Sequence, residues 1–546
     1  MRKKRSLLVA AFWIAVLMLA FGILSGAPRV IGAPATVGPA DHPMPSGAAA
    51  ASEFAHCAYL KVPSQYPTIQ SAINAAEPCD TILVASGTYI GQLTIDKSIS
   101  IVGSGAGRTI IESPAALVPD IFGTLWTIEL GNAATVSLSG FTLLVTLQCL
   151  IPGPYYAAYG TPYEGGGIGV GGGAYLNLQS AVVTTTGQSE GGSCGAPGDF
   201  LTYGSGIGFG LDYAVGSPSA SALIGTGVVS GVTISGFGFA GSSIEIGGQA
   251  DSPAGSSAVI SQDRIYTSAD ATLYEVAVAL GFSFTAETAT IVNNFIDGQA
   301  SVYIDLIEVA SGSSAYIAHN TILGDPGGQV IALADNGAPT TPATVEYNSI
   351  QVGAEGGGII ALGGGPLVVT HNSIMGSTSD FSEGIFLYAV ESATISSNVM
   401  GSFECELNPT YVSYGLCGPD YATQYQLFGI LLGSSGTGSF VVTNNLIYSA
   451  DVGIELTEGC VQCTVTGNTI QNSVDYGLSG VDGSYTFGPN VIYGGAYGVA
   501  SIAYSVDTAV TLSYVVMVAP TVAPFYYEVD ITGGTATITG TWVVLP

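Results

Sequence analysis

Short runs in which every second residue is apolar recur along most of this chain, separated by turns that contain Gly or Asn. In Gly384-Ile385-Phe386-Leu387 and Gly453-Ile454-Glu455-Leu456, alternation places the apolar side chains on one face of an extended strand. Between residues 293 and 492, an Asn stands eight times just before an apolar pair or an Ile. These residues are Asn294, Asn320, Asn348, Asn372, Asn398, Asn445, Asn468 and Asn490.

The spacing of these asparagines is 26, 28, 24, 26, 47, 23 and 22 residues, and the step of 47 corresponds to about two units with an insertion. A period in the low twenties, built from short β-type runs, predicts one coil of a solenoid per repeat. We expect each Asn amide to bond the same Asn one coil away, in a ladder that satisfies the groups of the turn. His319 and His371 precede two of these asparagines and are interpreted as turn residues.

The pattern changes near residue 59. Pro67 followed by Ile69, Ala72, Ile73 and Ala76 on one face predicts a short amphipathic helix, which we expect to cover the open end of the solenoid. Strands are expected at 81–84, 93–95 and 99–102.

The segment from Val62 to Ile111 contains Tyr-Pro-Thr-Ile-Gln-Ser-Ala-Ile, Asp-Thr-Ile-Leu-Val, Gly-Thr-Tyr and Ser-Ile-Ser-Ile-Val-Gly. It resembles the opening coil of the pectin lyase-like superfamily, especially pectin methylesterases and NosD-type proteins. The later Asn-containing units resemble the coil repeats of the same superfamily, so the resemblance covers most of residues 59–500. It implies an all-β fold, a right-handed single-stranded parallel β-helix.

The expected organisation begins with a targeting segment over residues 1–35. Four basic residues precede an 18-residue apolar run, Leu7 to Leu24, which is typical of a cleaved signal peptide or an uncleaved anchor. Residues 36–56 read as a Pro/Ala/Gly linker and 57–546 as the β-helix, with a loop-rich insertion at 150–215 and a C-terminal cap at 501–546. Either form of the N-terminus predicts export, and contact with a membrane only through the anchor.

The net charge of the chain restricts the classes of partner that we expect it to bind. After residue 35, 39 acidic and four basic residues remain, which gives a formal charge of −35. Such a surface repels nucleic acid and anionic lipid, and it requires a bridging cation such as Ca²⁺ if the ligand is a polyuronate. An acidic environment is an alternative explanation, because protonated carboxyls leave the surface nearly neutral.

Eight cysteines suit an exported protein. We expect four local disulfides, which are Cys57 with Cys79, Cys149 with Cys194, Cys405 with Cys417, and Cys460 with Cys463. Zinc binding at 460–463 lacks a second pair of ligands.

No catalytic motif of pectin methylesterases or polygalacturonases is present. The outward row is predicted as Ala332, Ala361, Phe386, Leu431, Glu455, Ser479 and Ala500, with Asp305 about six coils, or roughly 29 Å, from Glu455. The candidate catalytic carboxyls are Asp451, Glu455 and Glu383, because hydrolysis of a neutral glycan needs two carboxyl groups about 5–10 Å apart.

Tyr155, Tyr156, Tyr159 and Tyr163 form a cluster that could stack on sugar rings or could be ordinary surface residues. Two classes of function remain. The first is an extracellular protein that binds or processes polysaccharide, and the second is a non-catalytic structural or adhesive protein that contacts the cell envelope. Copper delivery, by analogy with NosD, finds no Met/His cluster, and no cofactor is required.

Overall fold

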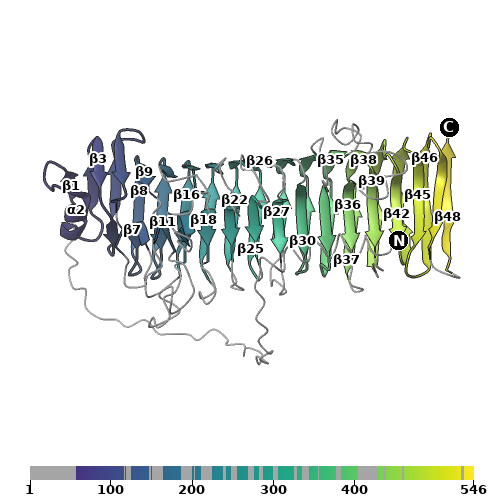
Figure 1. Ribbon diagram of the computed structural model, residues 1–546, viewed down its shortest axis with the longest axis horizontal. Helices are drawn as coiled ribbons and strands as arrows, with labels where there is room; N and C mark the ends of the chain where they lie inside the picture. Colours follow the sequence, from purple (N-terminus) through teal and green to yellow (C-terminus); the bar gives the residue numbers. More distant parts are fainter. Residues whose placement is uncertain are drawn as a thin grey trace, which may run out of the picture. The chain divides into compact units, whose positions relative to one another are not determined.

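The computed structural model describes residues 57–115, 117–118, 125–146, 149–150, 164–185, 200–201, 203–210, 224–237, 242–247, 255–267, 276–281, 287–298, 305–310, 312–324, 329–334, 343–353, 356–376, 383–403, 427–433, 438–457, 460, 462–530 and 534–546. The segments 1–35 and 36–56 lie outside these residues. The fold is the right-handed parallel β-helix that the repeats predict, with its coils stacked along one axis (Figure 1). No helix among the described residues is long and apolar enough to cross a membrane.

Each coil contributes one strand to sheet B and two strands to sheet A. Sheet B holds β4 (Leu93–Ile95), β7 (Leu125–Leu130), β11 (Glu164–Val170), β15 (Tyr203–Phe209), β18 (Ser242–Ile246), β21 (Val276–Leu280), β24 (Ile307–Val309), β27 (Gln329–Ala334), β30 (Gly357–Leu362), β33 (Ile385–Tyr388), β36 (Phe428–Gly433), β39 (Val452–Thr457), β42 (Tyr476–Val481), β45 (Tyr497–Ala503) and β47 (Ala523–Val529), in that spatial order.

Sheet A contains the remaining parallel strands. They are β1 (Tyr59–Val62), β2 (Thr81–Val84), β3 (Gly87–Ile90), β5 (Ser100–Gly103), β6 (Thr109–Glu112), β8 (Thr135–Ser139), β9 (Thr142–Val145), β12 (Tyr175–Gln179), β13 (Val182–Thr185), β16 (Thr226–Ser230), β17 (Thr233–Ser235), β19 (Ser257–Ser261), β20 (Arg264–Tyr266), β22 (Thr288–Val292), β23 (Phe295–Asp297), β25 (Ser314–Ala318), β26 (Thr321–Leu323), β28 (Ala343–Glu346), β29 (Ser349–Gln351), β31 (Leu367–Thr370), β32 (Ser373–Met375), β34 (Ser392–Ser396), β35 (Val399–Phe403), β37 (Ser439–Thr443), β38 (Leu446–Ala450), β40 (Gln462–Thr466), β41 (Thr469–Gln471), β43 (Ser484–Phe487), β44 (Val491–Tyr493), β46 (Thr508–Val518) and β48 (Ala536–Leu545). A separate antiparallel pair joins β10 (Cys149–Leu150) and β14 (Phe200–Leu201).

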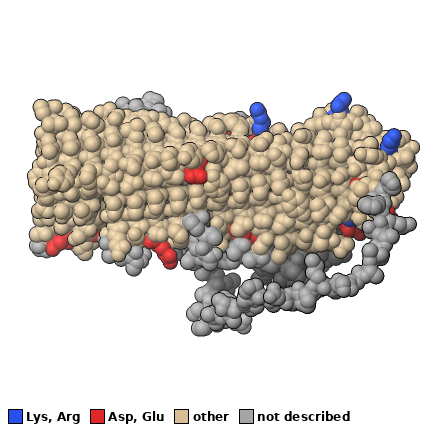
Figure 2. Space-filling model, turned by 180° about the vertical axis from the view of Figure 1, so that it is seen from behind, with Lys and Arg blue, Asp and Glu red and all other residues tan. Residues whose placement is uncertain are grey.

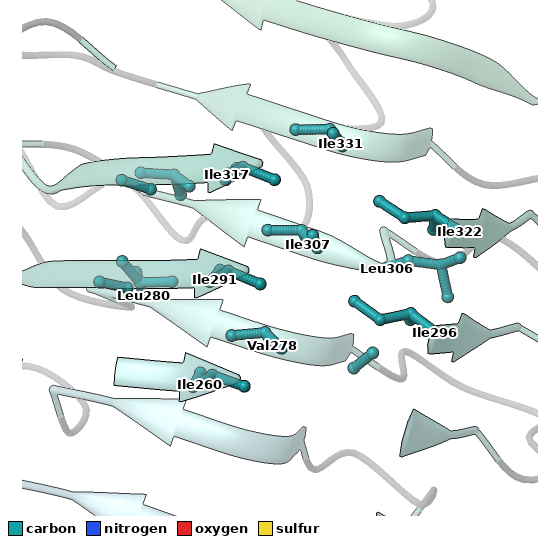
Figure 3. Packing of buried hydrophobic residues seen from close by; sticks show 14 of the residues in the cluster. Ile260, Val278, Leu280, Ile291, Ile296, Leu306, Ile307, Ile317, Ile322 and Ile331 are labelled. Carbon is teal, nitrogen blue, oxygen red and sulfur yellow. The ribbon is translucent and has the colours of Figure 1, made fainter. Parts of the chain in front are cut away.

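The core runs along the axis between the two sheets. Ile291 of β22, Ile307 of β24 and Ile322 of β26 are fully buried and belong to columns of aliphatic side chains repeated in successive coils (Figure 3). Burial of each such side chain stabilises the fold by roughly 1.5–3 kcal/mol, so the stack gains stability coil by coil.

The helix α2 (Ile69–Ala75) lies at the N-terminal end of the stack (Figure 1). Its first turn is capped by Thr68 and Ser71 in a reciprocal capping box, and Ile69, Ala72 and Ile73 are buried as the pattern predicts. The Lys97 ammonium donates to the carbonyl oxygens of Asn74 and Ala76 at 2.9 and 3.0 Å, where a cation is favoured at the C-terminus of a helix.

The eight asparagines form a continuous buried ladder at the bend between the two strands that each coil gives to sheet A. Asn372 is representative: its Nδ2 donates to Oδ1 of Asn398 at 3.0 Å, while its own Oδ1 accepts from the backbone N–H of Asn348 at 3.0 Å. His319 and His371 occupy the left-handed position just before the ladder and stack on either face of Tyr347, at centroid distances of 5.1 and 4.7 Å.

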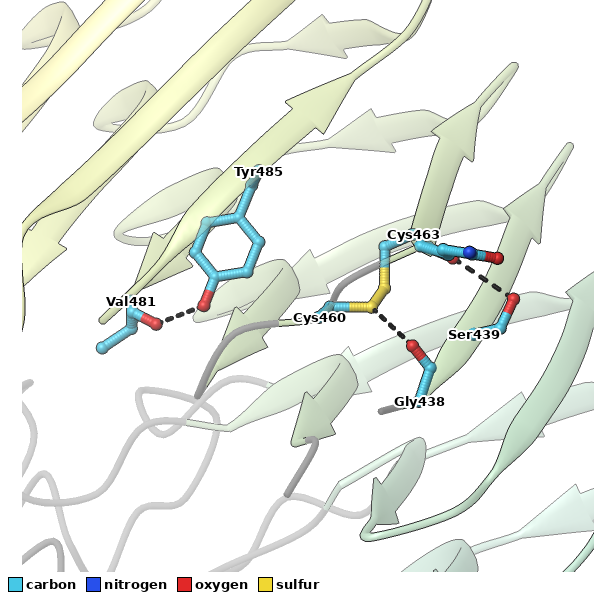
Figure 4. The surroundings of a disulfide bond; sticks show 7 residues. Gly438, Ser439, Cys460, Cys463, Val481 and Tyr485 are labelled. Carbon is cyan, nitrogen blue, oxygen red and sulfur yellow. Dashed lines mark hydrogen bonds between the residues drawn. A yellow bond between two sulfur atoms is a disulfide. The ribbon is translucent and has the colours of Figure 1, made fainter. Parts of the chain in front are cut away.

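Two of the expected disulfides fall within the described residues. Cys57 pairs with Cys79, and Cys460 pairs with Cys463 (Figure 4). Cys194, Cys405 and Cys417 lie outside the described residues, and Cys149 lies in β10. Within 150–215, strands β11, β12, β13 and β15 continue the regular coils, and within 501–546 strands β46, β47 and β48 do the same.

Candidate functional site

In several strands of sheet B, two outward side chains stand three residues apart with two inward residues between them. In β24 and the residues before it, Leu306 and Ile307 are buried in the core, whereas the flanking Asp305 and Glu308 are only half-buried. The same spacing recurs in β42, where Tyr476 and Ser479 flank Gly477 and Leu478. We call the surface formed by these two outward positions the sheet B face.

Backbone pairing defines the second outward row and corrects the row expected from the sequence. In spatial order it is Thr94, Glu129, Gly169, Gly208, Glu245, Ala279, Glu308, Ala332, Ile360, Phe386, Leu431, Glu455, Ser479, Ala500 and Tyr526.

Two assignments in the expected row were wrong. Ile360 takes the place expected for Ala361, and Glu308 takes the place expected for Asp305. Ala361 is 1% exposed and pairs with Leu333 and Leu387 in the core. The error arose because Ile359-Ile360 permits two alignments, and a shift of one residue moves each side chain to the other side of a strand.

Three carboxyl residues stand at outward positions of β18 and of the segment that contains β24, and we call Glu245, Asp305 and Glu308 the carboxyl site. Only the Ala279 strand separates Glu245 from Glu308, which places their backbones about 10 Å apart at the usual strand spacing. The Ser205 hydroxyl donates to Glu245 Oε2 at 2.6 Å, and the Gln329 backbone N–H donates to Asp305 Oδ1 at 3.1 Å.

Burial dominates the electrostatics of this site. It raises the pKa of Glu245 to about 7, against the opposing effect of the Ser205 hydrogen bond. It also raises the pKa of Asp305 to about 6, where the Gln329 hydrogen bond again opposes it. For Glu308, burial and then the neighbouring charge of Asp305 raise the pKa to about 8.

Trp126 lies on the same face in β7, three strands before Glu245 and five before Glu308. Its indole lies over two glycines of the outward row, since an ideal Cβ at Gly169 would sit 2.5 Å from Cγ and one at Gly208 would sit 2.6 Å from Cη2. The ring thus extends from β7 across β11 and β15 toward Glu245 of β18. Trp126 is fully buried, and its indole N–H has no hydrogen-bond partner. A buried donor of this kind costs roughly 1–3 kcal/mol when it is left unpaired.

The carboxyls proposed from the sequence fall farther along the same molecule. Three strands farther along sheet B, Glu383 occupies the outward position that corresponds to Asp305. Five strands farther along, Glu455 occupies the position that corresponds to Glu308. The backbones of Glu308 and Glu455 are therefore about 24 Å apart, compared with the 29 Å expected between Asp305 and Glu455. Burial raises the pKa of both carboxyls to about 7. Asp451 lies beside the first outward position of its strand, Val452, and its Oδ2 accepts from the Leu427 backbone N–H at 3.1 Å. Its carboxyl group therefore stabilises the backbone just before β36.

An aromatic cluster closes the C-terminal end of the sheet B face. We call Tyr476, Tyr497 and Tyr526 the tyrosine cluster, since their ring centroids are 5.0 to 5.9 Å apart. Tyr476 is 7% exposed, Tyr497 and Tyr526 are half-buried, and the Tyr526 hydroxyl donates to Glu528 at 2.9 Å. The expected stacking residues Tyr155, Tyr156, Tyr159 and Tyr163 lie outside the described residues.

No strand of sheet B contains a Lys or Arg. Of the four basic residues after residue 35, Lys61 and Arg264 lie in strands of sheet A, Arg108 precedes β6, and Lys97 contacts α2. Figure 2 shows a side of the molecule on which charges of either sign are sparse.

The described donors do not form a metal centre. No group of three or more His, Cys, Asp or Glu side chains among them could hold an ion. Copper favours sulfur and imidazole ligands. However, His319 and His371 are packed against Tyr347, the Met375 sulfur lies 3.3 Å from the Tyr448 hydroxyl, and Met400 is buried in the core. These residues do not fit a bound copper ion.

Residues 256–498 match the family described as periplasmic copper-binding protein (NosD), which covers the central coils of this chain. This match accords with the resemblance of the coil repeats, while the described side chains differ from a copper site. The comparison with curated proteins finds no significant match.

Three solved structures that this chain resembles are distant from it in sequence. A GH87 alpha-1,3-glucanase catalytic unit from Streptomyces thermodiastaticus is 13% identical over 90% of this chain and 71% of its own, with a TM-score of 0.35. A PL6 alginate lyase complex with trisaccharide is 12% identical over 80% and 85%, with a TM-score of 0.35. The tailspike protein of E. coli bacteriophage HK620, in complex with pentasaccharide, is 12% identical over 87% and 73%, with a TM-score of 0.37. Likeness at this level carries no argument about function.

Proposed function

We propose that this protein is exported and binds a neutral carbohydrate chain along the sheet B face. The observation that supports the proposal best is the alignment of hydrogen-bonding carboxyls and a tyrosine cluster on one face without any Lys or Arg. Sugar recognition combines hydrogen bonds to hydroxyl groups with the flat faces of aromatic rings. Export is supported by the N-terminal apolar run and by the disulfides.

The charge of the face favours a neutral glycan over a polyuronate. Glu245, Glu383 and Glu455 are buried, or nearly so, without a cation nearby, and they are favourable there only as uncharged acids. A uronate chain would bring further carboxylates to this face. No Lys or Arg in the strands of this face could pair with them, whereas a neutral chain needs neither such a partner nor a bridging Ca²⁺.

The spacing of the two ends favours an extended chain. Strand β24 carries Glu308 of the carboxyl site, and β42 carries Tyr476 of the tyrosine cluster. Six strand steps separate these two strands, so their backbones are about 29 Å apart. A polysaccharide that contacts both ends therefore runs parallel to the helix axis. Short oligosaccharides would reach only one end and would bind more weakly.

The test is binding of the purified protein to neutral and acidic polysaccharides, measured by isothermal titration and affinity electrophoresis. The probes are α-1,3-glucan, β-1,3-glucan and xylan oligosaccharides, with polygalacturonate as the charged comparison. Tyr497→Ala should raise the Kd about tenfold, since an aromatic contact contributes about 1–1.5 kcal/mol. Tyr316→Ala, which removes a ring 38% exposed on sheet A, is the matched control.

A non-catalytic adhesive role is the second candidate. Its support is the half-buried apolar run of Ile360, Phe386 and Leu431 on the same face, because contiguous apolar side chains at a rigid surface often contact other proteins. Absence of binding to every neutral glycan, together with concentration-dependent association in sedimentation, would favour this role over the first.

A further inference from the structure

We propose that Asp263 carries a proton in the folded protein and acts as the first donor of the asparagine ladder, which is complete only while this proton is bound. The bend between β19 and β20 is then a pH-sensitive element of the fold. The inference concerns the bends of sheet A and is independent of the proposed carbohydrate binding.

Asp263 occupies the ladder position of its coil. The backbone N–H of Phe295 donates to the Asp263 carbonyl oxygen at 2.9 Å, and one coil later that of Thr321 donates to Asn294 at the same distance. Oδ1 of Asp263 accepts from the backbone N–H of Val232 at 2.7 Å. Oδ1 of Asn294 accepts from the backbone N–H of Asp263 in the same way, at 2.9 Å. The carboxyl group thus replaces a ladder amide, and its Oδ2 stands where an asparagine has its Nδ2.

Each ladder Nδ2 faces oxygen atoms that accept hydrogen bonds. The Nδ2 of Asn294 donates to Oδ1 of Asn320, in the next coil, at 3.0 Å, and to the carbonyl oxygen of Ile260 at 3.0 Å. Ile260 stands three residues before Asp263, the ladder residue of the preceding coil. By the same register, Oδ2 of Asp263 faces Oδ1 of Asn294 and the carbonyl oxygen of Val229.

A protonated carboxyl fits this arrangement, whereas an ionised one does not. Asp263 is 1% exposed, and its Oδ2 has no hydrogen-bond partner. A proton on Oδ2 supplies the O–H donor that an oxygen atom between two acceptors requires. Without the proton, a buried negative charge would stand between two further oxygen atoms, at the desolvation cost of an unpaired ion.

No neighbouring charge offers the carboxylate a partner. The adjacent strands β16, β17, β19 and β22 contain no titratable residue, and neither do the bends of the two neighbouring coils. Arg264 and Tyr266 of β20 and Asp297 of β23 flank the inward isoleucine of their strands and stand on the outer side of sheet A. None of the three therefore faces the buried Asp263 carboxyl.

The direction of the pH effect follows from the burial of this group. Burial raises the pKa of Asp263 from 3.8 to about 7, although backbone hydrogen bonds with Val232 and Ser261 oppose the rise. The folded protein then keeps the proton up to about pH 7, whereas the unfolded chain releases it near pH 3.8. The contribution to stability is fully present below pH 3.8 and is lost as the pH rises to about 7.

The experiment compares urea unfolding of the purified protein and of Asp263→Asn, which places an amide at this ladder position, by circular dichroism from pH 4 to pH 8. At pH 4 the two unfolding constants should agree within about tenfold. At pH 8 the constant of the wild type should exceed that of the variant by up to about a thousandfold, since each unit of pKa shift is a factor of ten. Glu346→Gln, which alters a half-buried carboxyl of sheet A, is the matched control and should keep the pH dependence of the wild type.

A second variant and a spectroscopic measurement separate the proton from packing. Asp263→Val copies Val232, the residue at the same position of the preceding coil, and should be less stable than the wild type at pH 4 but lose the same part of the pH dependence as Asp263→Asn. Infrared difference spectra between wild type and either variant should show a protonated carboxyl at pH 5 that ionises near pH 7. A carboxylate signal at pH 5, or the same pH dependence of unfolding in the wild type and both variants, would overturn the inference.

Discussion

The carboxyl of Glu455 makes a quantitative prediction about stability and pH. Its side chain is 8% exposed on the sheet B face, and burial raises its pKa from 4.5 to about 7. The folded protein therefore keeps this proton up to about pH 7, whereas the unfolded chain releases it near pH 4.5. The contribution of Glu455 to stability is fully present below pH 4.5 and is lost as the pH rises to about 7.

The magnitude follows from the shift. A pKa change of about 2.5 corresponds to about 3 kcal/mol of unfolding free energy, at 1.36 kcal/mol for each pH unit. Glu455→Gln replaces the carboxyl with a neutral group of nearly the same shape. The variant should match the wild type within about 1 kcal/mol at pH 4 and should be more stable by up to about 3 kcal/mol at pH 8.

The measurement is urea unfolding monitored by circular dichroism at pH 4, 6 and 8, with Glu346→Gln as the control at the surface of sheet A. The relevant quantity is the change in unfolding free energy between pH 4 and pH 8, compared between variant and wild type. An equal change in both proteins would show that Glu455 is ionised in the fold and would refute the burial argument.

Two further predictions concern the coils. Asn372→Ala removes a side chain that makes five hydrogen bonds, to Val345, Thr370, Asn348 twice and Asn398, and should lower the unfolding free energy by about 3–5 kcal/mol. Thr321→Ala, at the exposed start of β26, should cost less than about 1 kcal/mol in the same denaturation assay. Cys57→Ser opens a disulfide across 22 residues and should cost about 3 kcal/mol, clearly more than Cys460→Ser, which opens one across 3 residues. Equal melting temperatures of the two cysteine variants would contradict the loop-length argument.

The sequence was informative where the pattern repeats. Alternation of apolar residues and the spacing of the asparagines predicted the coils, because each coil must bury the same columns of side chains and satisfy the same bend. The N-terminal helix could be predicted from Pro67 and the face formed by Ile69, Ala72 and Ile73. These features depend on local chemistry that is visible in a short stretch of chain.

The outward row was harder to predict. Two consecutive inward residues separate Asp305 from Glu308, so simple alternation misplaces one of the pair. Glu245 and Glu308 are each flanked by two aliphatic residues, in Ile244-Glu245-Ile246 and Ile307-Glu308-Val309. In a strand whose aliphatic residues face the core, this pattern indicates that the acid between them faces outward. The Trp126 ring lies over Gly169 and Gly208, about 40 and about 80 residues farther along the chain, and no local pattern reveals these contacts.

The scarcity of Lys and Arg in this chain affects the protonation of the carboxyl groups on the sheet B face. No Lys or Arg follows residue 264, so a carboxyl placed on the later coils has no cation with which to pair. A buried carboxylate without a partner is strongly unfavourable, and the group keeps its proton instead. Burial accordingly raises the pKa of Glu245, Glu383 and Glu455 on this face. Burial also raises the pKa of Asp305, to about 6, although the Gln329 backbone N–H opposes that rise.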